Sequence, residues 1–148
     1  MIYTPLTKKA MKLCFEAHKD QKDRTGLPYV FHPFHLAEQM KDEYSAAAAL
    51  LHDVVEDTDT TFEDLQKEGI PEKVIEALRL LTHSPEVPYM EYVAKTASDP
   101  IAAAVKLADL NHNSDMSRLD NITDKDIQRH KKYLDAVSLL NELTNGHL

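Results

Sequence analysis

Apolar residues recur every three or four positions along most of the chain, which is the spacing of one face of an α-helix. Leu6, Ala10, Leu13 and Ala17 follow this period and predict an amphipathic helix over about residues 4–20. Similar patterns predict helices over about residues 33–40, 44–56, 74–81, 88–98 and 101–113, a short helix after residue 60 and a long last helix from about residue 123. No stretch alternates convincingly between polar and apolar residues. The pattern therefore predicts an all-α fold, a compact helical bundle that forms a single domain over residues 1–148.

Helix-start signals support these boundaries. Pro33 suits the first position of a helix, and His32 suits the capping position before it. Thr60 with Glu63 has the spacing of a capping box, in which two side chains satisfy free backbone N–H groups at the helix start. The same kinds of signal precede the last two predicted helices at Asp99-Pro100 and at Thr123 with Asp126.

The stretch over residues 45–59, SAAAALLHDVVEDTD, begins with a run that is apolar on every side of a helix. Such a helix is buried, so we expect His52 and Asp53 to lie at or near the interior. On a continuous helix, Glu56 lies one turn after both of them, and Asp57 lies one turn after Asp53. Carboxylates crowded in a low-dielectric interior repel each other unless a cation lies among them. The stretch therefore predicts a metal site with catalytic acids beside it.

A second apolar run, IAAAVKLADLNHN, also delivers polar groups at its C-terminal end. Asp109 shares a helix face there with Lys106 and Asn113, so a structural ion pair with Lys106 is one interpretation of this carboxylate. The other interpretation is that Asp109 binds a metal together with His52 and Asp53. His32 is a third candidate ligand, although a histidine before proline is also a common helix cap, and His35 competes with it.

Two imidazole nitrogens and two carboxylate oxygens form a mixed ligand set that suits manganese, iron, cobalt or zinc. A metal with open positions lowers the pKa of a bound water and so generates a nucleophile. The residues alone therefore predict hydrolytic chemistry, and they leave the identity of the histidine ligand open.

Composition narrows the possible partners. A net charge of −8 argues against a general nucleic-acid surface or an acidic membrane surface, although local cations and a metal could still attract a phosphorylated small molecule. The single Cys14 cannot form an internal disulfide and is expected to be an inert, structural thiol. No apolar run has the length of a signal peptide or a membrane span. We therefore expect a cytoplasmic protein; its oligomeric state is not predicted.

Three segments in this order, RTGLPYVFHP, LLHDVVEDT and KLADLNHN, resemble the signature segments of the HD phosphohydrolase superfamily. More narrowly, they resemble the hydrolase domain of the bifunctional alarmone enzymes and the stand-alone small alarmone hydrolases. The resemblance covers about residues 17–118. It implies that one divalent metal, manganese, is bound by His32, His52, Asp53 and Asp109. It also implies that Glu56 and Asp57 orient or deprotonate the attacking water, and that Arg24 and Asn113 contact the nucleotide.

Two departures from the family pattern concern nucleotide recognition. Asp23-Arg24 stands where the alarmone enzymes commonly carry two basic residues, and Asp115 stands where they carry an arginine. Arg118 and Lys106 are candidates to restore the positive charge.

The resemblance implies hydrolysis of guanosine 3′,5′-bis(diphosphate) to GDP and pyrophosphate, through a water that the metal activates. The departures leave three alternatives: the same chemistry on another nucleotide or a phosphorylated dinucleotide, a regulatory module that binds a nucleotide without turnover, or buried ion pairs without a metal.

Overall fold

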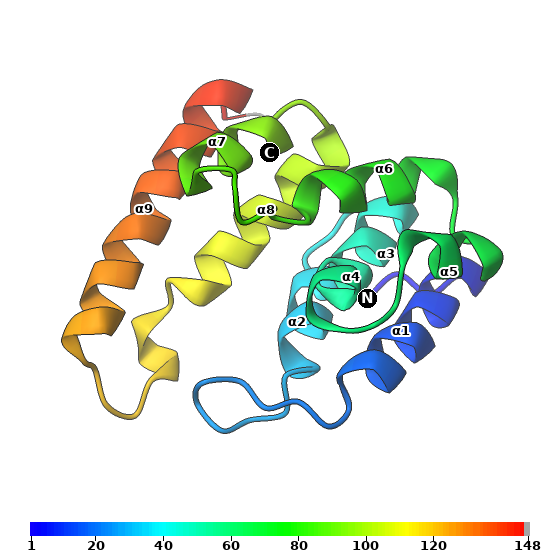
Figure 1. The fold of residues 1–148 in the computed structure, drawn as a ribbon, viewed down its shortest axis with the longest axis horizontal. Coiled ribbons are helices and arrows are strands. Elements are labelled where there is room, and N and C mark those ends of the chain that lie inside the picture. The colour runs from blue at the N-terminus through cyan, green and yellow to red at the C-terminus, as the bar shows by residue number, and fades with distance from the viewer. Residues whose placement is uncertain (147–148) are drawn as a thin grey trace.

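The computed structural model describes residues 1–146, and these residues form helices joined by loops. In chain order the helices are α1 (Pro5–His18), α2 (Phe31–Glu38), α3 (Glu43–Leu51), α4 (Val54–Asp57), α5 (Phe62–Lys67), α6 (Glu72–Leu81), α7 (Tyr89–Thr96), α8 (Pro100–Asn113), the 3₁₀ helix η1 (Met116–Arg118) and α9 (Asp124–Thr144) (Figure 1). The described residues contain no β-strand, only an isolated bridge between Lys22 and Pro28. The prediction of an all-α fold is confirmed. None of the described helices is both long enough and apolar enough to cross a membrane.

Helix α3 lies at the centre of the main core. Every residue from Ser45 to Leu51 is buried, as the run of apolar residues predicts. Helices α1 and α2 pack against α3, and α6 and α8 also contact it (Figure 1). Burial on all sides fixes the direction of α3, so its C-terminal residues are carried into the interior beside α8.

Helix α8 separates two apolar clusters. Its residues Ala102, Val105 and Ala108 pack into the main core around α3. On its other side, Ala103 and Leu110 pack into a second cluster with residues of α7 and α9. Figure 1 shows α9 running beside α8, away from the helices of the main core. A helix with two buried faces is apolar all round, which explains why α8 resembles α3 in sequence.

The capping signals place two of four helix starts correctly. Thr123 and Asp126 form a capping box at α9, and Asp99 accepts hydrogen bonds from the first backbone N–H groups of α8. The capping box expected at Thr60 is wrong by one residue, because Thr61 pairs with Asp64 instead.

Helix α2 begins at Phe31, so His32 and Pro33 lie in its first turn and the expected cap at His32 is also wrong. Proline is tolerated there because the first N–H groups of a helix have no partner within the helix. Inside this first turn, the His32 side chain is buried.

The predicted continuous helix over residues 44–56 is also wrong, because α3 ends at Leu51 and α4 starts only at Val54. The His52 side chain donates from Nδ1 to the carbonyl oxygen of Ala49 at 2.7 Å. That carbonyl is the one that a continuous helix would offer to the N–H of Asp53, so the side chain competes with the backbone for it. Asp53 then adopts φ −110° and ψ 1°, and the chain bends at the start of α4.

Candidate metal centre and its two cavities

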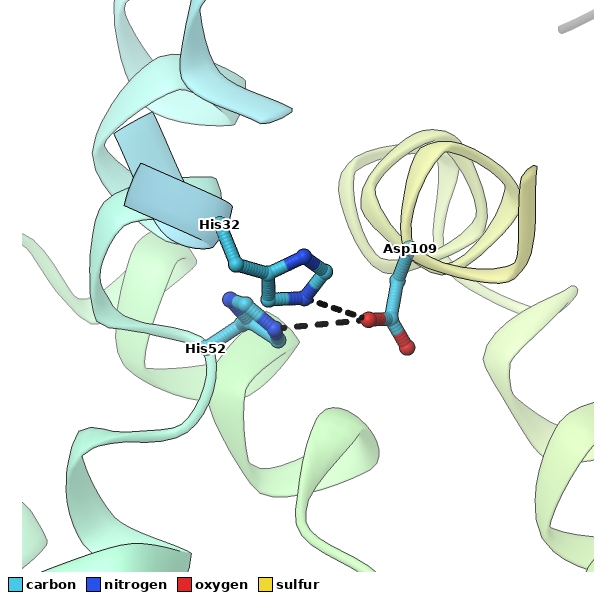
Figure 2. A group of neighbouring side chains, drawn as sticks. All are labelled: His32, His52 and Asp109. Atoms are coloured by element: carbon cyan, nitrogen blue, oxygen red, sulfur yellow. Dashed lines mark hydrogen bonds and ion pairs between the residues drawn. The ribbon is translucent and has the colours of Figure 1, made fainter. Parts of the chain in front are cut away.

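Three side chains from α2, α8 and the end of α3 converge on one buried point. One ligand atom each from His32, His52 and Asp109 lies within 4.8 Å of the other two (Figure 2). His32 Nε2 is 2.9 Å from Asp109 Oδ1, and His52 Nε2 is 3.6 Å from the same oxygen. In the sequence, His32 and His52 are 20 positions apart, and His52 and Asp109 are 57 positions apart. The fold thus brings distant residues together.

The His52 ring shows what the cluster requires. Because its Nδ1 donates to a carbonyl oxygen, Nε2 of the neutral ring carries only a lone pair. This buried Nε2 has no hydrogen-bond partner among the described residues, and it faces Oδ2 of Asp53 at 3.1 Å as well as Asp109. A lone pair opposite two carboxylates is repulsive, so the position requires a positive charge, either a proton on Nε2 or a metal ion.

The pKa values show the same requirement. Burial alone would lower the pKa of His52, but the carboxylates of Asp53 and Asp109 outweigh burial and raise this pKa well above its usual value. Burial would raise the pKa of Asp109, yet Lys106 and the two histidines hold it well below its usual value. Both carboxylates therefore stay ionised, and the site attracts a cation.

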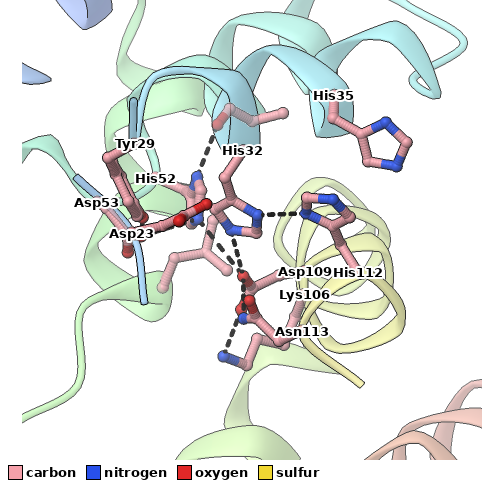
Figure 3. Close-up of polar contacts among 12 residues, drawn as sticks. Asp23, Tyr29, His32, His35, His52, Asp53, Lys106, Asp109, His112 and Asn113 are labelled. Atoms are coloured by element: carbon pink, nitrogen blue, oxygen red, sulfur yellow. Dashed lines mark hydrogen bonds and ion pairs between the residues drawn. The ribbon is translucent and has the colours of Figure 1, made fainter. Parts of the chain in front are cut away.

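The ion pair between Lys106 and Asp109 is present as well. Lys106 Nζ lies 3.0 Å from Asp109 Oδ2, and Asn113 Nδ2 donates to Asp109 Oδ1 at 2.9 Å (Figure 3). The ammonium neutralises one carboxylate and leaves the charge of Asp53 uncompensated. The structural ion pair is therefore compatible with a bound cation: Lys106 pairs with Asp109, and the cluster still needs a further positive charge beside Asp53.

Asp53, the fourth predicted ligand, lies next to this group of three rather than within it. Its Oδ2 accepts a hydrogen bond from the Tyr29 hydroxyl and faces His52 Nε2. Burial would raise the pKa of Asp53, but His52 and the Tyr29 hydroxyl lower it to about 2. Asp53 therefore contributes a full negative charge at the edge of the cluster.

Contacts with His112 distinguish the two candidate histidine ligands of the first segment, His32 and His35. Its Nδ1 lies 2.7 Å from His32 Nδ1, and its pKa is lowered to about 4 by burial and by Arg118, so the ring is neutral and can accept. His32 Nδ1 then carries the proton and Nε2 points its lone pair at the cluster. The exposed His35 packs against His112 with tilted rings whose centres are 4.2 Å apart, and it lies apart from the ligand atoms (Figure 3). The geometry thus favours His32.

The donors present fit a divalent cation. Two imidazole Nε2 atoms converge with lone pairs directed inward, and each ring is fixed by a bond from its Nδ1. Carboxylates of Asp53 and Asp109 supply oxygen donors and negative charge. This mixed set lacks thiolates and suits a catalytic ion of the manganese-to-zinc series rather than a structural zinc.

Glu56 and Asp57 line two different cavities on either side of the cluster. The larger, here called the Asp57 cavity, has a volume of about 560 Å³, and its walls include Asp57, Arg24, Asn113, Arg118, Arg129 and Tyr133. The smaller, the Glu56 cavity, has a volume of about 200 Å³, and its walls include Glu56, His52, Asp53, Lys106, Lys132 and Tyr133. Asn113 and Tyr133 line both cavities, so the cluster lies where the two adjoin.

The two acids differ in their contacts. Glu56 Oε1 accepts a hydrogen bond from the backbone N–H of His83 at 2.7 Å, which fixes its carboxylate. Burial, Asp53 and Glu56 together raise the pKa of Asp57 to about 6. A carboxylate with a pKa close to neutrality is a stronger base than an ordinary one.

The predicted substrate residues are partly engaged in structural contacts. Arg24 forms an ion pair with the buried Asp126 at the start of α9. Arg118 donates to the carbonyl oxygen of His112 at 2.9 Å and lies 3.5 Å from Asp23. Both arginines still line the Asp57 cavity, so they are positioned cations rather than freely moving ones.

Several site residues were not predicted from the sequence. Tyr29, which lies within the first family segment, contacts Asp53 through its hydroxyl. Arg129, Lys132 and Tyr133 of α9 share a helix face by their spacing, which is the available signal, but the sequence does not place that face beside α8.

Comparisons with known proteins identify relatives of this chain. The family model described as HD domain matches residues 10–131. The chain is 36% identical over 126 residues to guanosine-3′,5′-bis(diphosphate) 3′-pyrophosphohydrolase of Aquifex aeolicus, a match that covers 77% of this chain and 17% of that protein. It is 41% identical over 71 residues to the pyrophosphohydrolase MESH1 of Danio rerio, which covers 43% of this chain and 39% of that one. This chain thus spans a minor part of these relatives.

A solved structure is similar over nearly the whole chain. It belongs to a metazoan ortholog of SpoT that hydrolyses ppGpp and plays a role in starvation responses, and the TM-score is 0.76 at 26% sequence identity. The match covers 99% of this chain and 89% of the other.

Proposed function

The chain belongs to the HD-domain family, and from this premise we propose that it hydrolyses guanosine 3′,5′-bis(diphosphate) to GDP and pyrophosphate. The observation that carries the proposal is the buried Nε2 of His52, which faces two carboxylates with no partner among the described residues. The names of the similar proteins from Aquifex aeolicus and Danio rerio support the choice of substrate.

We propose that one manganese ion is held by His32, His52, Asp53 and Asp109. A divalent ion held there supplies a water of lowered pKa and offsets negative charge on the phosphoryl oxygens. Asn113 holds Asp109 in place through its amide, and His112 and Ala49 fix the orientation of the two histidines. These hydrogen bonds thus hold the ligand side chains in place without the metal ion.

In this proposal Asp57 is the general base and Glu56 positions the water. The raised pKa of Asp57, about 6, lets it accept a proton while it remains mostly ionised at neutral pH. Glu56 is held by the N–H of His83 and would orient the water. The water oxygen bonds to the phosphorus, the bond from phosphorus to the 3′-oxygen breaks, and the 3′-oxygen takes up a proton.

The Asp57 cavity is the proposed site for the nucleoside. At about 560 Å³ it is the larger of the two cavities, and it lies within the size range of small-molecule sites. Arg24 and Arg118 bring positive charge to its wall, and Asn113 lies where it adjoins the metal ligands.

One observation favours a related reaction on a different nucleotide. Asp23 and Asp115 also line the Asp57 cavity. Burial would raise the pKa of Asp23, but hydrogen bonds from Thr25 outweigh it and lower this pKa, and hydrogen bonds from Ser117 lower the pKa of Asp115. Two carboxylates reduce the attraction for a highly charged alarmone. The same chemistry on another phosphate ester is therefore the second candidate.

One assay tests both candidates. Purified protein is incubated with manganese and guanosine 3′,5′-bis(diphosphate), with Asp53→Ala as the control, and released pyrophosphate is measured. Release well above the control supports the alarmone assignment. Release at the control level, together with phosphate release from another nucleotide in a panel, would transfer the assignment to that nucleotide.

We also propose a cytoplasmic location. Cys14 is buried, and burial is the main cause that raises the pKa of its thiol to about 12, so it is an unreactive core residue. A structural thiol without a disulfide fits a reducing compartment.

A further inference from the structure

The Glu56 cavity has two chemically different ends. At the metal-facing end it is lined by the carboxylates of Asp53, Glu56 and Asp109. Its remaining wall includes Tyr89 of α7, Lys106 of α8, and Lys132 and Tyr133 of α9, together with Leu81 and His83. A negatively charged ligand is therefore accepted at the lysine end, next to the cluster.

Only one of the two lysines is available to such a ligand. Lys106 is buried and paired with Asp109 at 3.0 Å. Within residues 1–146, Lys132 forms no ion pair and no hydrogen bond; its Nζ lies 4.4 Å from the ring centre of Tyr89 and 5.4 Å from that of Tyr133. Partial burial, Arg129 and Lys106 lower the pKa of Lys132. The side chain is exposed, and its ammonium lies over two aromatic rings and near two other cations, so a bound anion would stabilise it.

Two hydroxyl groups add to this end of the cavity. Neither the Tyr89 nor the Tyr133 hydroxyl forms a hydrogen bond to another described residue, whereas that of Tyr92 donates to the carbonyl oxygen of Leu81 at 2.8 Å. Burial raises the pKa of Tyr89 and of Tyr133, so both keep their protons and can donate. An ammonium group and two O–H donors around one small cavity match the acceptor oxygens of a phosphate group.

We propose that the Glu56 cavity binds the 3′-diphosphate group of the substrate, with Lys132 recognising its outer phosphate and the hydroxyls of Tyr89 and Tyr133 assisting. The inference deepens the proposed function and rests on it for the identity of the substrate. The nucleoside then occupies the Asp57 cavity, and the inner phosphate lies between the two cavities at the metal ligands. Lys132 thereby selects a 3′-diphosphate over a 3′-monophosphate.

The test measures binding of inorganic pyrophosphate to the manganese-loaded protein by calorimetry, with manganese in excess over pyrophosphate. Lys132→Ala should weaken pyrophosphate binding about tenfold, which corresponds to about 1.4 kcal/mol. Lys132→Arg should retain most of it. Lys131→Ala is the matched control, because this neighbouring lysine is exposed and does not line either cavity. Binding of inorganic phosphate, which the proposal assigns to the metal ligands alone, should be weakened less by Lys132→Ala.

A second measurement separates this inference from the proposed function. With the alarmone as substrate, Lys132→Ala should raise KM about tenfold and change kcat less, since in this proposal Lys132 contacts the outer phosphate and not the phosphorus that the water attacks. Equal pyrophosphate binding by wild type and Lys132→Ala, or equal losses in Lys132→Ala and Lys131→Ala, would overturn the inference even if alarmone hydrolysis is observed. Lys132-dependent pyrophosphate binding without alarmone hydrolysis would support the subsite and reject the alarmone.

Discussion

Replacing Lys106 by methionine tests how the buried charges are balanced. Lys106 Nζ and Asp109 Oδ2 are 3.0 Å apart, and both side chains are at most 10% exposed. At an effective dielectric constant of about 20, two unit charges at this distance attract by roughly 5.5 kcal/mol before desolvation. Breaking such a pair from one side costs about 3–5 kcal/mol, because the other charge remains buried. Asp109 keeps the hydrogen bond from Asn113, so we expect about 3 kcal/mol, the lower end of this range.

The assay is urea unfolding of the metal-free protein at neutral pH. Lys106→Met should lower the free energy of unfolding by about 3 kcal/mol, and a second substitution, Asp109→Asn, should restore a large part of it. Lys95→Met is the matched control, since Lys95 is 58% exposed and lies 3.8 Å from Glu91; it should change the stability by less than about 0.5 kcal/mol. A loss in Lys106→Met no larger than in this control would refute the reasoning.

Three further predictions concern the cluster and its walls. Because the carboxylates raise the pKa of His52, metal binding must displace a proton, so metal affinity should weaken as the pH falls, and calorimetry in two buffers of different ionisation enthalpy should detect the released proton. Asp57→Asn should stabilise the metal-free protein by about 1 kcal/mol above pH 6 while it abolishes turnover. The reason is that a pKa of about 6 makes ionised Asp57 unfavourable in the folded state, and the gain should vanish below about pH 4, where Asp57 is protonated in both the folded and the unfolded state. Asp126→Ala should cost about 1–2 kcal/mol in thermal unfolding and raise KM for the nucleotide, since it removes both the capping-box partner of Thr123 at the start of α9 and the partner of Arg24.

Local patterns were sufficient to predict most of the fold. The apolar runs of α3 and α8 identify buried helices, and the caps at Asp99 and Thr123 depend on contacts within a few residues. The break after Leu51 was missed because it depends on a bond from the His52 side chain to its own backbone, which the hydrophobic pattern does not record. Glu56 and Asp57 consequently line two cavities instead of a single shared volume.

The candidate ligands could be predicted for a similar reason. His52, Asp53 and Asp109 lie in or beside the apolar runs of α3 and α8, whose burial is visible in the sequence, whereas His32 could be chosen only through the family resemblance. The walls of the site could not be predicted, because they depend on how distant elements pack. The pairing of Arg24 with Asp126 joins residues 102 positions apart, and Lys132 reaches the Glu56 cavity only because α9 packs against α8. Apart from the family resemblance, His32 could be preferred to His35 only from the contacts that His112 of α8 makes with both rings.

The most direct test of the central claim is a crystal structure of the protein grown with manganese, with anomalous diffraction recorded at the manganese absorption edge. The proposal predicts one strong peak per chain, bonded to Nε2 of His32, Nε2 of His52 and a carboxylate oxygen of Asp109, with Asp53 as a further ligand. A manganese-saturated crystal with no peak at this position, or with a peak that His52 does not contact, would contradict it.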